Sequence, residues 1–298
     1  MKLSKIQFDI LSLLAVSSEH FNLEKITVDL KYSDDEIINA YNELVFGGYI
    51  EDNKISCYGI EALEPYRVKR AIFIAAGFGS RLVPITLNTP KPLVRVHGVR
   101  IIDHLIDACL NIGIDEIYVV RGYLAEQFDQ LLYKYPMIKF LENPVYNEAN
   151  NISSALIARN LLENSYVFEA DLFIKNPTIV KKYHYTSGFL AIKKIRTDDW
   201  CFKVKDDIII EEMVGGEGND IWQMVGISYW NSEDGSKLKN DIQAVYTSPG
   251  GKERYWEQVP LVYKKENYSV SILECSDNDI VEIDTFNELK NLDKSYDI

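Results

Sequence analysis

The chain of 298 residues carries 32 Lys and Arg against 45 Asp and Glu, and its formal net charge of −13 should repel a phosphate backbone. Nucleic-acid binding as the main task is therefore disfavoured, and any anionic substrate must be attracted by a local cluster of cations. No apolar run approaches the roughly 20 residues that span a bilayer. The four cysteines are widely separated and form no C-x-x-C pair, which favours reduced thiols in the cytoplasm.

Residues 1–66 are expected to form a module of their own. Apolar residues between Ile6 and Leu14 have helical spacing and are interrupted by polar ones, which indicates an amphipathic helix rather than a signal peptide. A second, shorter helix is predicted over residues 23–30. A third is predicted to begin after Ser33, with a carboxylate at the capping-box position, and to end at Gly47.

Residues Tyr49–Ser56 are predicted to form a hairpin with Asp52 and Asn53 in the turn. Three helices followed by a hairpin resemble small winged-helix domains. Such modules often bind DNA, but residues 1–66 hold five lysines and no arginine against twelve acidic residues. The recognition helix would contain no cation, whereas phosphate contacts normally need several. We therefore expect a role in protein contact or in forming a homodimer, and regard DNA binding as disfavoured.

The second domain, residues 67–298, is organised around Ala71–Leu93. The apolar run Ala71–Ala75 predicts a buried strand of a parallel sheet. Glycines follow at once, which lets the backbone approach a ligand with its N–H groups turned inward. A fixed cation, Arg81, comes directly after them, and a second, Lys91, lies between Pro90 and Pro92, so the stretch has what a triphosphate needs.

From there, apolar strands alternate with amphipathic helices, which implies right-handed crossovers and a parallel sheet. Strands are predicted at residues 116–120, 138–141 and 166–170, and helices at residues 101–112, 124–135 and 150–162. Ligands of such sheets lie beyond the carboxyl ends of the strands, which places the Gly77 loop, Gly122 and Asp171 along one rim. After residue 186, shorter strands at residues 188–192, 201–204, 208–212 and 226–229 and a helix near residues 232–245 suggest a substrate-binding half.

Two acidic residues follow apolar strands, Asp171 after residues 166–170 and Asp284 after residues 280–283. Carboxylates at strand ends are suited to Mg²⁺, a hard cation that keeps water ligands for phosphates. Asp284 also fits a helix N-cap, and Asp171 fits an ordinary loop acid. Both kinds of role can coexist with metal binding.

Several motifs together resemble a known family. Gly77–Pro84 with Thr89–Leu93 is similar to the signature of nucleotidyltransferases that join an NTP to a phosphorylated small molecule. From about Arg70 onward the chain resembles the bacterial LicC-type choline-phosphate cytidylyltransferases, over roughly three quarters of its length. The matching pieces are Gly122–Phe128, Asn150–Ser154, Asn164–Asp171, Asp199–Trp200, Tyr255–Glu257 and Val281–Asp284.

The resemblance implies a Rossmann-like α/β fold and a set of site residues. It implies that Lys91 contacts the phosphate under attack, that Arg81 assists it, and that Asp171 and Asp284 hold Mg²⁺. Where the family has an aspartate two residues before the metal-binding aspartate, this chain has Glu169. The residues implied to surround the phosphates, cytosine and ribose of CTP are Ala75, Ala76, Gly77, Phe78, Gly79, Ser80, Gly122, Tyr123, Asn151 and Ser154.

Aromatic residues offer an independent argument about the acceptor. A quaternary ammonium ion donates no N–H hydrogen bond, so it is best bound by aromatic rings and a carboxylate. Trp200, Tyr255, Trp256 and Glu257 could supply these groups, or the rings could simply be core residues in an aromatic-rich chain. The family has aspartate in place of Glu257, and the longer glutamate side chain would suit an acceptor that carries a primary amine as well.

We therefore expect CMP transfer from CTP to phosphocholine, giving CDP-choline and pyrophosphate. One of Lys193, Lys194 and Arg196 is expected to bind the acceptor phosphate, with Lys193 chosen among them. The alternatives are 2-aminoethylphosphonate, phosphoethanolamine or a sugar 1-phosphate as acceptor. A hypothesis of another class is a nucleotide-sensing transcriptional regulator.

Overall fold

The computed structural model describes residues 2–16 and 32–297, so the helix predicted over residues 23–30 lies outside the described residues. The chain divides into two compact units. Unit 1 comprises Met1–Arg67 and Tyr183–Tyr185, and unit 2 comprises Val68–Lys182 and Thr186–Ile298. The sequence placed a boundary close to this one, but it did not anticipate that three residues from the middle of the chain belong to unit 1.

Unit 1 packs three described helices and a hairpin around a small core. Helix α3 begins with the expected capping box, since the Ser33 side chain accepts from the Glu36 N–H and the Glu36 carboxylate accepts from the Ser33 N–H. Tyr185 stacks on Tyr66 at 5.5 Å, and its hydroxyl donates to the Leu3 carbonyl oxygen. The winged-helix arrangement stays a prediction. The elements are α1 (Lys5–Val16), α3 (Asp34–Phe46), β1 (Ile50–Glu51), β2 (Lys54–Ile55) and α4 (Cys57–Leu63).

Unit 2 is built on a sheet of nine strands among the described residues, in the order β10-β14-β12-β11-β13-β8-β3-β6-β7. Strands β8, β3, β6 and β7 are parallel, and the register of Ile72 against Tyr118 and Val167 places β3 at their centre. This confirms the Rossmann-like α/β fold. These strands are β3 (Arg70–Ile74), β6 (Glu116–Arg121), β7 (Lys139–Glu142) and β8 (Ser165–Glu169).

The strands after residue 186 are longer than expected and extend the same sheet instead of forming a separate half. Strand β13 pairs antiparallel with β8. Strands β11 and β12, of ten residues each, form a hairpin whose turn, Asp206-Asp207, has positive φ at both residues. These strands are β10 (Gly188–Lys193), β11 (Arg196–Lys205), β12 (Ile208–Glu217), β13 (Ile221–Trp230) and β14 (Ser271–Cys275).

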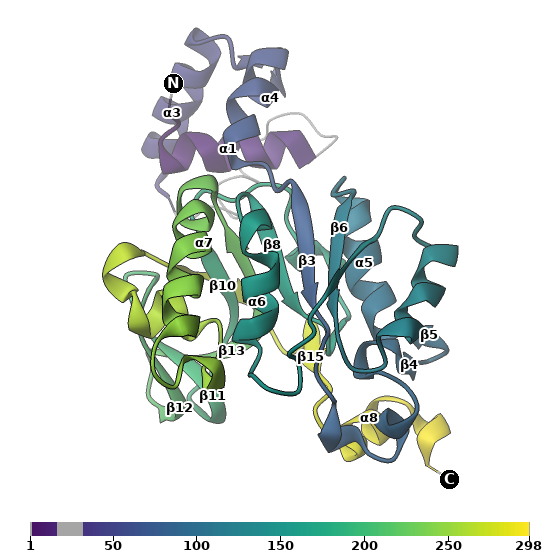
Figure 1. Cartoon of the computed structure of the whole chain (residues 1–298). Coiled ribbons are helices and arrows are strands. Elements are labelled where there is room, and N and C mark those ends of the chain that lie inside the picture. The colour runs from purple at the N-terminus through teal and green to yellow at the C-terminus, as the bar shows by residue number, and fades with distance from the viewer. Residues whose placement is uncertain (1, 17–31, 298) are drawn as a thin grey trace. The chain divides into compact units, whose positions relative to one another are not determined.

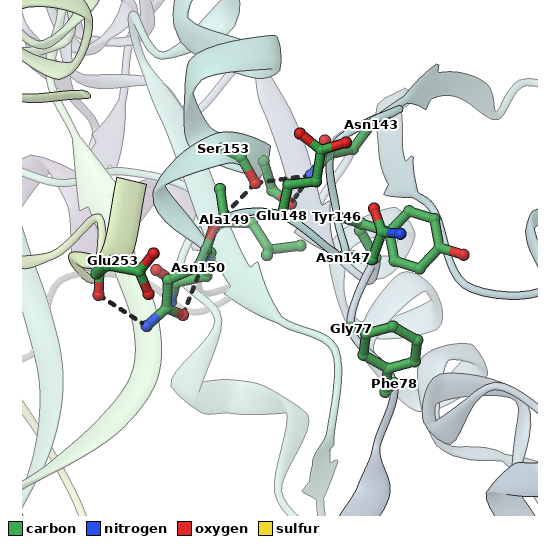
Figure 2. A pocket seen from close by; sticks show the side chains of 14 residues that line it. Gly77, Phe78, Asn143, Tyr146, Asn147, Glu148, Ala149, Asn150, Ser153 and Glu253 are labelled. Carbon is green, nitrogen blue, oxygen red and sulfur yellow. Dashed lines mark hydrogen bonds between the residues drawn. The ribbon is translucent and has the colours of Figure 1, made fainter. Parts of the chain in front are cut away.

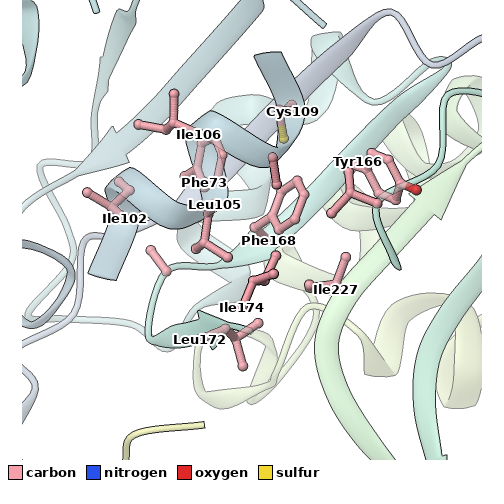
Figure 3. Packing of buried hydrophobic residues seen from close by; sticks show 14 of the residues in the cluster. Phe73, Ile102, Leu105, Ile106, Cys109, Tyr166, Phe168, Leu172, Ile174 and Ile227 are labelled. Carbon is pink, nitrogen blue, oxygen red and sulfur yellow. The ribbon is translucent and has the colours of Figure 1, made fainter. Parts of the chain in front are cut away.

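Helices cover both faces of the sheet (Figure 1). Helix α5 packs on the face that carries Phe73 and Phe168, whose rings stack at 4.9 Å (Figure 3). Helices α6 and α7 pack on the opposite face, against Ile72 and Trp230. Alternate residues of each central strand therefore enter two separate cores. The helices of unit 2 are α5 (Ile101–Asn111), α6 (Ile152–Ala158), α7 (Ser232–Thr247) and α8 (Phe286–Leu292).

Two short ribbons lie beside the main sheet. Strand β4 (Arg95–Val96) pairs with β5 (Val99–Arg100), and β9 (Leu172–Ile174) pairs antiparallel with β15 (Ile280–Glu282). In the second ribbon Glu282 lies opposite Leu172, and the Ile283 N–H donates to the Asp171 carbonyl oxygen. Two acids that are more than a hundred residues apart in sequence, Asp171 and Asp284, are thus held side by side.

Among the described residues, no helix combines the length and the apolar character needed to cross a bilayer.

Candidate active site

The loop after β3 runs from Ala75 to Arg81 and is anchored at its start, where the Ala75 N–H donates to the Val120 carbonyl oxygen at 2.9 Å. Gly79 has φ +62°, and a Cβ atom there would lie 2.9 Å from the Lys91 Cβ. Both the left-handed conformation and the close approach of Lys91 therefore require glycine at this position. The exposed Gly77, Phe78 and Ser80 occupy the rest of the loop.

Two cations and two carboxylates meet beside this loop. The buried Lys91 ammonium lies 2.9 Å from Asp171 Oδ2 and 3.0 Å from Asp284 Oδ1, and the Arg81 guanidinium lies 2.8 Å from Asp284 Oδ2. Burial alone would lower the pKa of Lys91, but the adjacent carboxylates of Asp171 and Asp284 raise it above its ordinary value. Lys91 is therefore a fixed cation held in one position, whereas the Arg81 side chain is two-thirds exposed and can reach toward a ligand.

More carboxylates gather here than these cations neutralise. Oxygens of Glu169, Asp171 and Glu282 lie within 4.8 Å of one another. Burial, followed by the charges of Asp171 and Asp284, raises the pKa of Glu282 to about 9. Burial and the neighbouring acids also raise the pKa of Glu169 well above its ordinary value.

The Asp171 Oδ1 atom is buried and has no hydrogen-bond partner, although Oδ2 is bound by Lys91. A buried carboxylate oxygen without a partner, within a cluster of acids, fits a hard divalent cation. The residues present therefore fit Mg²⁺. The sequence did not include Glu282 in this set, although its place two residues before Asp284 on the ribbon strand β15 was a usable signal.

A pocket of about 520 Å³ opens next to the glycine loop. Figure 2 shows Phe78 and Tyr146 together at one side of it and Glu253 at the other. The buried Asn143 amide donates to the hydroxyls of Ser153 and Ser154 at 2.9 and 3.0 Å, which holds the first turn of α6 beside the pocket (Figure 2). Of the residues expected at the nucleotide, Ala76, Gly77, Phe78, Asn151 and Ser154 line this pocket.

Gly122 and Tyr123 do not line the pocket themselves but contact residues that do, Tyr146 and Ala76. A Cβ atom on Gly122 would lie 2.7 Å from the Tyr146 ring, so glycine is needed for that ring to pack there. The Tyr123 N–H donates to the Ala76 carbonyl oxygen, and its hydroxyl donates to the Thr86 carbonyl oxygen. Asn143 and Tyr146, which line the pocket, were missed because a single Asn and a single Tyr in a loop carry no pattern.

Asn151 connects the pocket to a second group of acids. Its Oδ1 accepts from the backbone N–H of Trp256 at 2.8 Å, which fixes the orientation of the amide. Its Nδ2 then faces Glu257 Oε2 at 3.4 Å and Glu169 Oε1 at 3.5 Å. Asn151, predicted to lie near the nucleotide, therefore lines the pocket and also contacts these two glutamates through its side-chain amide.

The expected acceptor residues divide into two groups. Trp200 and Tyr255 are partly exposed and meet edge to face at 5.5 Å. Trp256, in contrast, is 2% exposed and packs in the core against Phe189 and Trp230, so its ring is not open to a ligand.

The basic residues near Trp200 are spread over the surface. Lys193 is exposed, with its ammonium 5.5 Å from the centre of the Trp222 ring. Lys194 pairs with Asp277, and Arg196 lies 3.7 Å from Asp198. The described contacts of these three side chains join none of them to the Lys91 cluster.

The rim of this doubly wound sheet carries a glycine loop, a fixed lysine and clustered carboxylates beside a pocket. These features are typical of an enzyme that uses nucleoside triphosphates as substrates. Comparison with known proteins supports this class. The nucleotidyl transferase family model matches residues 70–192.

A 2-aminoethylphosphonate cytidylyltransferase of Lancefieldella rimae is 36% identical over 76% of this chain and 92% of the relative. A choline-phosphate cytidylyltransferase of Streptococcus pneumoniae is 31% identical over 76% of this chain and 97% of the relative. The solved structure of the S. pneumoniae CTP:phosphocholine cytidylyltransferase, LicC, superimposes with a TM-score of 0.69, covering 77% of this chain and 99% of that one. The chain belongs to the cytidylyltransferases of the nucleotidyl transferase family.

Proposed function

We propose that this protein transfers CMP from CTP to the phosphate or phosphonate group of a small molecule that carries a cationic amine, and releases pyrophosphate. The observation that carries the proposal is the position of the Lys91 ammonium, which lies between Asp171 and Asp284 and next to Gly79 of the glycine loop. Phosphocholine is the acceptor expected from the sequence. The relative that acts on 2-aminoethylphosphonate makes a primary amine the second candidate.

The nucleotide would lie with its base in the pocket beside Phe78 and Tyr146 and its phosphates along the glycine loop. An oxygen of the acceptor phosphate or phosphonate attacks the α-phosphorus of CTP, a new P–O bond forms, and the bond to the β-phosphate oxygen breaks. The attacking oxygen is already an anion at neutral pH, so no general base is required. Catalysis is then positioning and charge stabilisation, in which Lys91 and Arg81 face the charge that develops on the phosphates.

Asp171, with Asp284 and Glu282 beside it, would hold Mg²⁺ through the oxygen that Lys91 leaves free. When bound, the ion supplies positive charge that neutralises the triphosphate and favours departure of pyrophosphate. The ion pairs of Lys91 with Asp171 and Asp284 would hold its ammonium at the proposed reaction centre before the nucleotide binds.

The test is pyrophosphate release with CTP and a panel of acceptors: phosphocholine, phosphoethanolamine, 2-aminoethylphosphonate and a sugar 1-phosphate. We expect release with at least one of the amine-bearing acceptors, dependence on Mg²⁺, and little release with the sugar 1-phosphate. Release with the sugar 1-phosphate alone would contradict the proposal.

A further inference from the structure

The connection formed by residues 80–91 carries both cations of the reaction centre, Arg81 and Lys91. Its middle part is loosely packed, since the apolar side chains of Val83 and Leu87 are 47% and 60% exposed. A segment with few buried side chains depends on its hydrogen bonds to keep a single conformation. The hydrogen bonds of this middle part therefore help to decide where the two cations lie.

Two side chains from the segment after β6 hold the middle part of the connection, residues 83–90. The Tyr123 hydroxyl donates to the Thr86 carbonyl oxygen at 2.9 Å, and the Gln127 amide donates to the Asn88 carbonyl oxygen at 2.7 Å. Among the described residues, the hydrogen bonds that join residues 83–90 to the fold outside the connection come from these two side chains. Together they clamp the backbone of the connection.

Further contacts extend from this clamp to the glycine loop. Thr86 is 2% exposed, and its hydroxyl donates to the Gly79 carbonyl oxygen at 2.8 Å. Gly79 is the residue whose left-handed conformation accompanies the close approach of Lys91. The Tyr123 ring lies 5.1 Å from the ring of Phe78, also in the loop. A displacement of residues 83–90 would therefore be passed to the loop that is proposed to bind the phosphates.

Gln127 lies in the short 3-10 helix η5 (Ala125–Tyr133), which is anchored in the core. The next residue, Phe128, is fully buried in the same core cluster as α5. The carbonyl oxygen of Gln127 accepts from the Gln130 amide at 2.9 Å, a contact within the helix. The clamp thus has its donor on an anchored element and its acceptor on a loosely packed one.

We propose that Gln127 is a positioning residue for the transfer reaction. With Tyr123, it clamps residues 83–90 and so keeps the glycine loop and Arg81 in the geometry that faces the phosphates. The inference rests on the proposed function and adds to it a residue that does not line the pocket. Groups that need no reorganisation stabilise developing charge best, so loss of the clamp lowers kcat more than it weakens binding of the acceptor.

The experiment compares wild type with two variants of Gln127. Gln127→Met keeps the length of the side chain and removes its N–H donors, whereas Gln127→Lys returns an N–H donor. Gln130→Met is the matched control, because the described contacts of Gln130 are with Gln127 and Arg100 and do not include residues 83–90. Pyrophosphate release is measured with CTP, Mg²⁺ and the amine-bearing acceptor that the wild type uses fastest.

We expect Gln127→Met to lower kcat about 3–10-fold, the effect of losing one hydrogen bond of ordinary strength, and to change the acceptor KM less than about twofold. Gln127→Lys should recover most of this loss, and Gln130→Met should match wild type. Amide hydrogen exchange reads the clamp without any activity assay. In the nucleotide-free protein, residues 83–90 should exchange about 3–10-fold faster in Gln127→Met, with the exchange of β3 unchanged.

The contrary outcomes can be told apart. A wild type that releases pyrophosphate with no amine-bearing acceptor removes the proposed function, and the positioning role with it. Unchanged exchange of residues 83–90 in Gln127→Met removes the clamp. Faster exchange with an unchanged kcat, or a fall in kcat that Gln127→Lys does not recover, removes the positioning role alone. A fall in kcat that accompanies a clear drop in the thermal unfolding temperature would indicate a folding defect and would also contradict that role.

Discussion

Replacing Glu212 by glutamine should stabilise unit 2, and increasingly so as the pH rises. Burial raises the pKa of Glu212, which lies on β12, from 4.5 to about 7. Between these two pH values the carboxyl group is protonated in the folded state and ionised in the unfolded state. The free energy of unfolding therefore falls as the pH rises between about 4.5 and about 7, and the penalty from Glu212 reaches its full size above this range. At about 1.36 kcal/mol per pKa unit, the full penalty is about 3 kcal/mol.

Glutamine fills the same space and does not ionise, so the variant avoids this penalty. The linkage relation gives a gain over wild type that is about 2 kcal/mol larger at pH 8 than at pH 5.5. Urea unfolding followed by tryptophan fluorescence measures it, because all four tryptophans lie in unit 2. Glu211→Gln, on the exposed face of the same strand, is the control and should change little at either pH. A gain for Glu212→Gln that does not depend on pH, or a loss at pH 8, would refute the reasoning.

Four further substitutions test the reaction centre and the acceptor site. Asp171→Ala should abolish pyrophosphate release while the thermal unfolding temperature stays close to that of wild type, and more than a few per cent of wild-type activity would contradict the metal assignment. Lys91→Met should lower kcat about 10²–10³-fold, as for removal of one group that stabilises developing charge, and a change in KM alone would argue for a binding role only. Trp200→Ala should raise the acceptor KM by the several-fold that one cation–aromatic contact of about 0.5–2 kcal/mol supplies, and an equal rise in the CTP KM would remove Trp200 from the acceptor site. Gly79→Ala should destabilise the loop by about 1–2 kcal/mol and displace Lys91, with retained wild-type kcat as the contrary result.

The sequence predicted the fold well where local pattern decides structure. Strand β3 is a run of apolar residues buried on both faces, and the glycines and cations that follow it form a long, specific motif. Strand β12 was harder, because Glu211 and Glu212 are adjacent acids and nothing local shows which of the two points inward. That depends on its pairing with β11, which is a tertiary property.

Trp256 was predicted at the acceptor because it adjoins Tyr255 and Glu257 in sequence. Its ring is instead enclosed by Phe189 and Trp230. Asn151 was found by resemblance, but the partners of its amide come from segments far away in sequence. Composition and spacing carry no information about such partners.

The central claim, cytidylyl transfer to a small cationic phosphate or phosphonate, is tested most directly by pyrophosphate release from CTP in the presence of Mg²⁺. The account predicts release that requires an acceptor bearing both an anionic phosphorus group and an amine, and that is lost in Asp171→Ala. Release that is independent of the acceptor, or that is supported by none of the amine-bearing acceptors, would contradict it.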